Sequence, residues 1–121
     1  MPWQYSQSTG QLTRNGIVVD TGYSGAPAGR NNPLMQQMRN IGPIPQGRYS
    51  IGIPRNSDEY GPHVMDLTPI LHSAFGRTEF LIHGERRNGP AGNASQGCII
   101  FGPTIRHQIS ASGDRELVVT N

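Results

Sequence analysis

The chain of 121 residues falls within the usual size of one domain. Glycine and proline account for 26 of these residues, about 21% against a usual share of about 12%, and such frequent turns argue against a helical bundle or a coiled coil. All ten basic residues are arginine and the formal net charge is only +2. Without a basic stripe interleaved with aromatic residues, nucleic acid is not an expected partner.

Alternating or continuous apolar segments between turn-forming residues predict the strands of a mainly β (α+β) domain spanning residues 1–121. Asn15-Gly16 is a strong hairpin signal, because both central residues of such a tight turn take positive φ. With Thr9-Gly10, it predicts an N-terminal β-meander. The predicted strands are Trp3–Ser8, Gln11–Arg14, Ile17–Thr21, Arg48–Ile53, Val64–Leu67, Glu79–His83, Cys98–Phe101 and Glu116–Thr120. Pro54–His63 and Glu85–Gln96 are expected to be loops.

Two segments carry the capping or proline signals of short helices, namely Asn32–Met38 and Pro103–Ser112. Met35 and Met38 are expected to fill gaps in the core, because the flexible thioether side chain packs into irregular spaces. A helical turn is also expected within Thr68–Phe75.

A histidine and the only cysteine of the chain lie in the segments Ile82-His83-Gly84 and Ser95-Gln96-Gly97-Cys98-Ile99. Two adjacent strands joined by the intervening polar loop would bring the His83 imidazole near the Cys98 thiol. A thiol needs such a base because free cysteine is mostly protonated at neutral pH. We expect Gly97, Gly84 and Ser95 to orient the pair or to form the oxyanion site. Gly97 allows a sharp turn, and the carbonyl of Gly84 or another nearby acceptor would hold the imidazole tautomer.

The alternative is structural: Cys98 would be a buried strand residue and His83 a hydrogen-bonded side chain at the end of a strand. A metal site is not expected, because the sequence contains no C-x-x-C or H-x-x-x-H pair.

These segments resemble the L,D-transpeptidases of the YkuD type, in which a His is followed at a similar spacing by Ser or Thr, then His-Gly-Cys and a hydrophobic residue. Pro45-Gln46-Gly47-Arg48-Tyr49 is similar to the Pro-x-Gly-x-Tyr segment ahead of their site. The closer resemblance is to type VI secretion effectors with L,D-transpeptidase and L,D-carboxypeptidase activity, and it covers nearly the whole chain. It is carried by Trp3-x-Tyr5, Thr9-Gly10, Asn15-Gly16, Gly22-Tyr23-Ser24-Gly25, Asn31-Asn32-Pro33, Gly42-Pro43-Ile44-Pro45-x-Gly47, Phe75-Gly76-Arg77, Ile82-His83-Gly84 and Ala94-Ser95-x-Gly97-Cys98-Ile99-Ile100.

The resemblance implies an L,D-transpeptidase-like β-sandwich or meander with a few short helices. It also implies that the Cys98 thiolate attacks the carbonyl at the L-centre of meso-diaminopimelate in a peptidoglycan stem tetrapeptide. D-alanine is protonated by His83 and departs, and a thioester with the enzyme remains. Water hydrolyses this thioester, or an amine attacks it to give a transfer product. The resemblance implies no cofactor. Two residues depart from the general pattern: Gln96 stands where the motif has His, and Ile100 where Arg or Asn follows.

The absent arginine leaves recognition of the substrate carboxylate without an assigned residue. Arg106 is the expected substitute and Arg77 the second candidate, because a guanidinium offers two parallel hydrogen bonds to a carboxylate. The alternative for each is a solvated guanidinium at the surface. Tyr23 and Ser24 are expected to line the substrate groove, unless their loop is only a connection.

Two other functions fit parts of the sequence. A non-catalytic cell-wall-binding β module would use Trp3, Tyr5, Tyr23 and Tyr60 as stacking platforms, and a cysteine hydrolase would act on cytosolic peptides.

The sequence has no apolar run long enough to span a membrane and no signal-peptide pattern at its N-terminus. We therefore expect synthesis in the bacterial cytoplasm without a signal peptide, secretion, and action in the periplasm of a target cell. The expected partners are peptidoglycan stem peptides, a cognate immunity protein and components of the secretion system.

Overall fold

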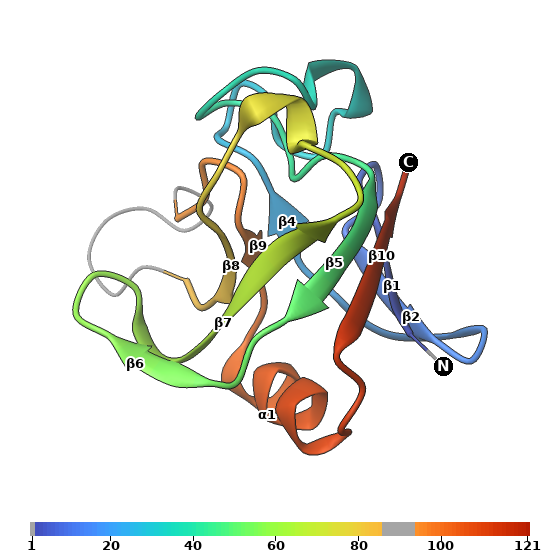
Figure 1. Cartoon of the computed structure of the whole chain (residues 1–121), viewed down its shortest axis with the longest axis vertical. Coiled ribbons are helices and arrows are strands. Elements are labelled where there is room, and N and C mark those ends of the chain that lie inside the picture. The colour runs from blue at the N-terminus through green and yellow to red at the C-terminus, as the bar shows by residue number, and fades with distance from the viewer. Residues whose placement is uncertain (1, 86–93) are drawn as a thin grey trace.

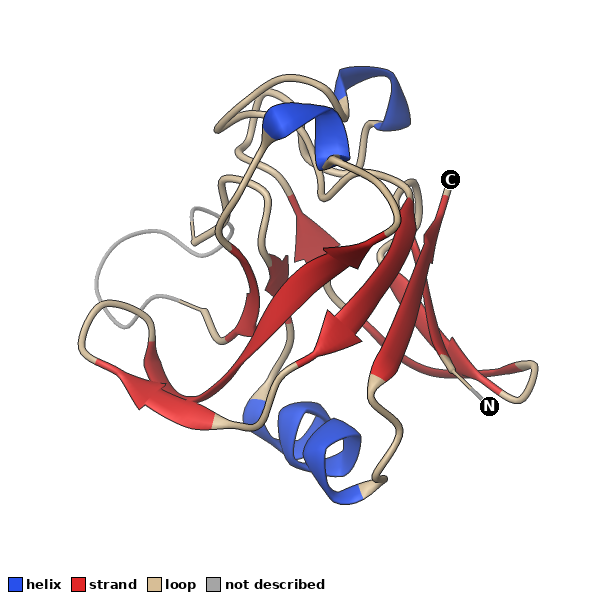
Figure 2. Cartoon of the chain, viewed as in Figure 1, coloured by secondary structure: helices blue, strands red, loops and turns tan. Residues whose placement is uncertain are grey.

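The computed structural model describes residues 2–85 and 94–121 of the chain. Within these ranges strands dominate, together with one α-helix and two short 3₁₀ segments (Figure 2). The elements are β1 (Trp3–Ser6), β2 (Gln11–Arg14), β3 (Ile17–Thr21), β4 (Tyr23–Ser24), η1 (Pro33–Met35), β5 (Gly47–Ile51), β6 (Arg55–Ser57), β7 (Gly61–Ile70), η2 (Ala74–Gly76), β8 (Phe80–His83), β9 (Ile99–Ile100), α1 (Pro103–Ala111) and β10 (Glu116–Thr120). The mainly β prediction is confirmed.

The strands form one curved sheet in the order β3-β2-β1-β10-β5-β7-β8-β9-β4, with β6 paired to β7 (Figure 1). The two outermost strands, β3 and β4, follow each other in the chain across Gly22, so the sheet nearly closes on itself. Gly22 must be small there, since a Cβ would lie 2.0 Å from the Ile100 carbonyl oxygen. The amide of Gly22 donates to the Gly10 carbonyl at 2.8 Å and so extends the pairing of β2 with β3 beyond Gln11 and Thr21.

The first three strands form the predicted antiparallel meander, with the Asn15-Gly16 turn at positive φ in both residues. β1 also runs parallel to β10, so the two ends of the chain are neighbours within the sheet. The core follows the period-two alternation of strands, because successive side chains point to opposite faces. Its strand residues are Trp3 and Tyr5, Leu12, Tyr49 and Ile51, Met65 and Leu67, Phe80 and Ile82, Ile99, and Leu117 and Val119.

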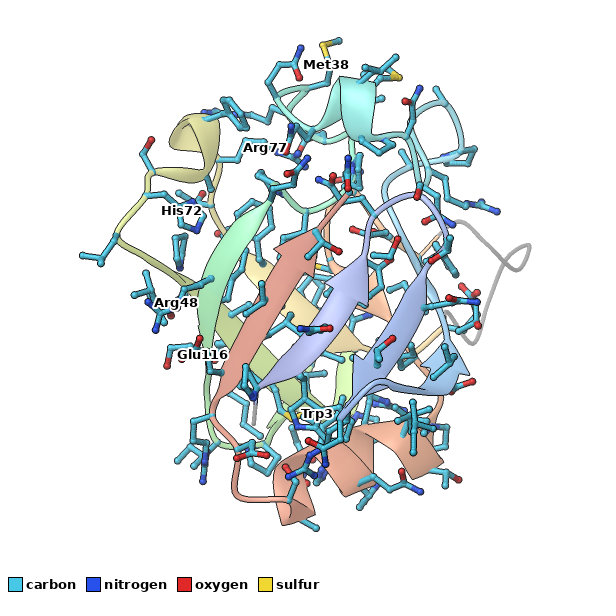
Figure 3. The ribbon with its side chains drawn as sticks, turned by 90° about the vertical axis from the view of Figure 1, so that its right-hand side faces the viewer. Trp3, Met38, Arg48, His72, Arg77 and Glu116 are labelled. Carbon is cyan, nitrogen blue, oxygen red and sulfur yellow. The ribbon has the colours of Figure 1, made fainter. Side chains whose placement is uncertain are left out.

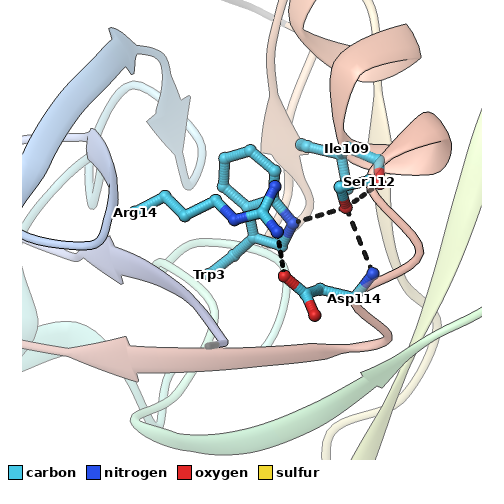
Figure 4. A network of polar contacts seen from close by, with 5 residues as sticks. All are labelled: Trp3, Arg14, Ile109, Ser112 and Asp114. Carbon is cyan, nitrogen blue, oxygen red and sulfur yellow. Dashed lines mark hydrogen bonds and ion pairs between the residues drawn. The ribbon is translucent and has the colours of Figure 1, made fainter.

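Helix α1 closes the lower end of the sheet in Figure 1 and adds Ile105 and Ile109 to the core. A polar network fixes its C-terminal end against the meander (Figure 4). Trp3 Nε1 donates to Ser112 Oγ at 3.2 Å, and the backbone amide of Asp114 donates to the same hydroxyl at 3.2 Å. Arg14 forms an ion pair with Asp114 and lies 4.7 Å from the centre of the Trp3 ring. These contacts hold α1, which carries Arg106, in a defined position.

The central strand β7 is longer than predicted. It continues through Pro62 and Pro69, whereas the sequence predicted a strand only over Val64–Leu67 and a helical turn after it. Proline is unfavourable inside a sheet because it lacks an amide hydrogen. Here the partners change along the strand: β8 pairs only with Met65–Leu67, so Pro69 has β5 as its single neighbour. The predicted loop before β7 contains β6, which forms a hairpin with it.

The prediction that Met35 and Met38 fill the core is wrong. The segment after Asn32 forms only the single 3₁₀ turn η1, capped by a hydrogen bond from Leu34 N to Asn32 Oδ1, and it buries no residue. Met38 is 41% exposed and lies at the outer surface (Figure 3). One turn is too short to present a continuous apolar face, so the core is closed by the sheet and α1 instead.

None of the helices in the described ranges 2–85 and 94–121 has the length and hydrophobicity required to span a membrane.

Candidate active site

His83 and Cys98 come together at the junction of β8 and β9. The two strands pair in parallel, with Ile82 opposite Ile99 and His83 opposite Ile100. Cys98 precedes Ile100 by two residues, so its side chain and that of His83 lie on the same face of the sheet. Both residues are buried, at 7% and 2% exposure, and both line a pocket of about 160 Å³.

The imidazole of His83 is oriented by the next residue of the chain. Its Nδ1 lies 2.8 Å from the carbonyl oxygen of Gly84. A carbonyl oxygen can only accept, so Nδ1 carries the hydrogen, and Nε2 of the neutral ring carries the lone pair of a base. The Tyr60 ring packs on the imidazole, with centroids 4.6 Å apart. This is the tautomer-fixing contact that the sequence suggested for Gly84.

Cys98 is a protonated thiol at neutral pH. Burial raises its pKa to about 11, while a backbone hydrogen bond from Leu81 and the charge of Arg77 act in the opposite direction. The carboxylates of Glu79 and Glu59 raise the pKa further. The thiol donates to the carbonyl oxygen of Glu79 at 3.6 Å. A thiolate therefore forms only when a base removes the proton, and His83 is the histidine in the same pocket.

Ser95 organises the turn that presents Cys98. Its hydroxyl, in a residue only 1% exposed, donates to the Cys98 carbonyl at 2.5 Å and accepts from the amides of Gly97 at 3.1 Å and Gly25 at 2.9 Å. The Gly97 amide is therefore engaged inside the turn and is not directed at an oxyanion. Gly97 instead supplies a backbone conformation at φ +138°, which side chains rarely adopt.

The two predicted groove residues of the glycine-rich loop lie in different environments. Ser24 is fully buried and does not line the groove: its hydroxyl donates to the Gly97 carbonyl at 3.0 Å and accepts from the Ile44 amide at 2.8 Å. Tyr23 lines a larger groove, and its hydroxyl donates to the Glu85 carboxylate at 2.7 Å. Burial and the hydrogen bond to Glu85 raise the pKa of Tyr23 to about 12.

Neither candidate arginine is a solvated surface residue. Arg106 is 6% exposed and donates from Nη1 to the carbonyls of Pro62 at 2.7 Å and His63 at 3.3 Å. Its Nη2 lies against Gly84, where a Cβ would approach to 2.9 Å, and the residue borders the larger groove. Arg77 is 4% exposed and its Nη atoms bind four backbone carbonyls. Those donors are therefore committed within the protein, whereas Arg106 reaches the groove.

The larger groove, of about 1270 Å³, adjoins the Cys98 pocket. Glu59, Tyr60, His83 and Ala94 line both. Tyr60 lies at the tip of the β6–β7 hairpin, where the sequence predicted only a loop. The available signal was Ser57 followed by Gly61: the Ser57 hydroxyl accepts from the amides of Glu59 and Tyr60, and Gly61 has φ +91°.

Two of the proposed stacking platforms are not surface residues. Trp3 is 3% exposed and Tyr5 is fully buried, so both belong to the core. Among the described residues, no three His, Cys, Asp or Glu side chains gather as a metal site.

Comparisons with known proteins bear on the fold and on the family of this chain. Bd1075 of Bdellovibrio bacteriovorus is similar in structure with a TM-score of 0.64 at 12% identity, over 97% of this chain and 46% of that one. The helical cell shape determining protein Pgp2 from Campylobacter jejuni gives 0.61 at 15% identity, over 98% and 46%. The chain thus has their fold and spans less than half the length of either. No curated protein matches it in sequence. A family model described as the Tlde1 domain matches residues 19–119, so the chain belongs to this family of type VI secretion L,D-transpeptidase effectors.

Proposed function

We propose that this protein is a cysteine-dependent L,D-carboxypeptidase and L,D-transpeptidase of peptidoglycan stem tetrapeptides. The observation that carries the proposal is that one pocket, beside the larger groove, is lined by both a buried thiol and an imidazole whose Nδ1 is fixed by the Gly84 carbonyl. Membership of the Tlde1 domain family supports the same chemistry.

In the first half-reaction, His83 Nε2 removes the proton of the Cys98 thiol. The sulfur attacks the carbonyl carbon at the L-centre of meso-diaminopimelate, and a tetrahedral intermediate forms. Its collapse breaks the bond to the D-alanine nitrogen, which takes the proton from His83 and leaves. The product of this half-reaction is a thioester between Cys98 and the tripeptide.

In the second half-reaction, His83 removes a proton from water or from an amine, which attacks the thioester. The Cys98 sulfur leaves and regains a proton. Water releases the tripeptide, and an amine gives a cross-linked or D-amino-acid-exchanged product. The thiol and the imidazole return to their starting forms in either case.

We assign recognition of the terminal D-alanine carboxylate to Arg106, because it borders the groove next to Gly84 and the tautomer-fixing contact. Tyr23 and Tyr60 line the same groove. The expected place of action is the periplasm of a target bacterium, with a cognate immunity protein and secretion-system components as partners.

The test is incubation of the purified protein with disaccharide tetrapeptides, followed by mass spectrometry. The expected result is loss of D-alanine, or its exchange when another D-amino acid is added, together with a tripeptide adduct on Cys98 in the intact-protein mass. Binding without conversion would support the alternative of a non-catalytic binding module. Of the four stacking platforms considered for such a module, only Tyr23 and Tyr60 are partly exposed.

A further inference from the structure

Arg77 is a buried cation beneath the turn that carries Cys98. Nη1 donates to the carbonyls of Gln36 at 2.6 Å and Pro43 at 2.8 Å, and Nη2 donates to those of Gly42 at 3.0 Å and Gln96 at 3.2 Å. Figure 3 shows Arg77 between the sheet and the loop that carries Met38. The guanidinium thus joins this loop to the residue two positions before the nucleophile.

The positive charge of Arg77 has no carboxylate partner. A charge that is removed from water is costly unless it is paired. All eight acidic residues of the chain lie in the described ranges, and no ion pair there involves Arg77. Two acidic groups interact electrostatically with the Arg77 guanidinium, the Tyr49 hydroxyl and the Cys98 thiol. Burial raises the pKa of Tyr49 far above the physiological range, which leaves Cys98.

The contact between Arg77 and the cysteine turn is close. A Cβ at Gly97 would lie 2.5 Å from Arg77 Nη2, so the guanidinium lies directly against the residue that precedes Cys98. The φ of +138° at Gly97 and the hydrogen bond from Arg77 to Gln96 belong to the same turn. Any side chain at position 97 would displace the cation.

We propose that Arg77 is a positioning residue: it holds the Gln96–Gly97 turn and supplies the fixed positive charge that the Cys98 thiolate faces once His83 has taken its proton. The inference rests on Cys98 being the nucleophile. It replaces the expectation that Arg77 binds a substrate carboxylate.

The charged side chains around Cys98 have opposite effects on the stability of its thiolate. Arg77 favours the thiolate, and Glu59 and Glu79 oppose it. Tyr60 and His83 line the same pocket. Because burial also disfavours the thiolate, a fixed cation is needed to offset three opposing effects when the sulfur becomes charged.

The first experiment measures the rate of Cys98 alkylation by iodoacetamide from pH 6 to pH 10, below the thiol pKa, where the rate is proportional to the fraction of thiolate and no substrate is needed. In Arg77→Gln we expect the thiolate fraction at a given pH, and with it the alkylation rate, to fall about tenfold. Arg77→Lys, which keeps the charge, should restore most of the difference. The matched control is Arg39→Gln, since Arg39 is an exposed arginine that donates to the Gly76 carbonyl. A folded Arg77→Gln protein that is alkylated at the wild-type rate across this pH range would overturn the proposal.

The second experiment keeps Arg77 and so does not depend on the folding of its variants. Cys98→Asp and Cys98→Asn are compared by thermal unfolding at pH 7, both in a background that carries His83→Gln, Glu59→Gln and Glu79→Gln, so that neither the imidazole nor the two opposing carboxylates contribute charge. If the charge of Arg77 faces position 98, it offsets the burial of the aspartate, and the aspartate variant melts within about 4 °C of the asparagine variant. A melting temperature lower by more than this would reject the proposal, because an unpaired buried carboxylate is far more costly. Failure of the proposed function appears separately, as turnover of tetrapeptides by Cys98→Ser.

Discussion

The ring of Tyr60 packs against the imidazole of His83, with centroids 4.6 Å apart and planes inclined by 35°. Tyr60 comes from the tip of the β6–β7 hairpin and His83 from the end of β8, so the contact joins the hairpin tip to the end of the strand that pairs with β7. Together with the hydrogen bond from Nδ1 to Gly84, it restricts the imidazole to one orientation. A general base needs such restriction because its efficiency depends on geometry before pKa.

The Tyr60 ring is therefore expected to matter more than its hydroxyl. Tyr60→Ala should lower kcat for tetrapeptide by about 10- to 100-fold, since small displacements of a reacting group are costly. Tyr60→Phe keeps the ring and should remain within about threefold of wild type in kcat. Steady-state kinetics on tetrapeptide checks both, and equal losses in the two variants would show that the hydroxyl is the important group.

Cys98 is the only thiol of the chain, so its replacement should abolish turnover. Cys98→Ser is nearly isosteric and is expected to fold normally while losing on the order of 10⁴-fold or more in kcat. His83→Gln should lose a comparable amount, and in this variant the alkylation of Cys98 at neutral pH should slow. The measurements are D-alanine release and thermal unfolding. Activity of Cys98→Ser within about tenfold of wild type would remove the cysteine from the mechanism.

Arg106 is expected to act on KM through the terminal carboxylate. Arg106→Lys keeps the charge but loses the planar pair of donors, so KM for tetrapeptide should rise about tenfold with a smaller change in kcat. A tetrapeptide with a C-terminal amide provides the control, because it has no terminal carboxylate. Its KM with the wild type should be high, and Arg106→Lys should not raise that KM further. Arg106→Gln should also destabilise the fold by about 1–3 kcal/mol, because the Pro62 and His63 carbonyls lose a buried donor. Unchanged KM in both variants would place the carboxylate anchor elsewhere.

The stacked pair His63 and His107, with centroids 3.8 Å apart, predicts a loss of stability in acid. Partial burial and the charges of His107 and Arg106 lower the pKa of His63 in the folded state. The unfolded chain then takes up a proton first, so the free energy of unfolding is unaffected above about pH 6.5 and falls as the pH drops from there through the lowered folded-state pKa.

Thermal unfolding between pH 7.5 and pH 4.5 measures this loss. His63→Asn should flatten part of the pH dependence, and asparagine tolerates the φ of +54° at this position. His72→Gln is the matched control, because His72 lies outside the pair and contacts the Arg48 carbonyl. A pH dependence unaltered by His63→Asn would assign the acid sensitivity to other groups.

The proposed place of action predicts an asymmetry between compartments. Expression in the cytosol, where polymeric peptidoglycan is absent, should be tolerated. The same protein fused to a periplasmic export signal should make cells swell or lyse, because tetrapeptides needed for cross-linking are consumed. Colony counts and microscopy compare the two, with Cys98→Ser in the same fusion as the control. Toxicity of the cytosolic form, or of the Cys98→Ser fusion, would contradict this prediction.

Local signals in the sequence predicted several elements well. The Asn15-Gly16 turn, the strands on either side of it and β10 occur at the predicted residues, because turn chemistry and period-two alternation act over only a few residues. Helix α1 begins at Pro103 as predicted and is followed by Gly113 at φ +78°. The same short-range information marked His83 and Cys98, since a lone thiol after glycine and a histidine at the end of an apolar run are visible without a fold.

Tertiary structure decided where the two candidate arginines lie and how far β7 extends. From the sequence, Arg106 is the first candidate for the carboxylate anchor and Arg77 the second, and the alternative for each is a solvated guanidinium. Arg77 is buried because carbonyls of residues 36–43 and 96 converge on it, whereas Arg106 lies between α1 and β7 and reaches the groove. β7 continues past Pro69 because only one neighbour pairs with it there. Each outcome depends on groups that are distant in the chain, and local periodicity carries no information about them.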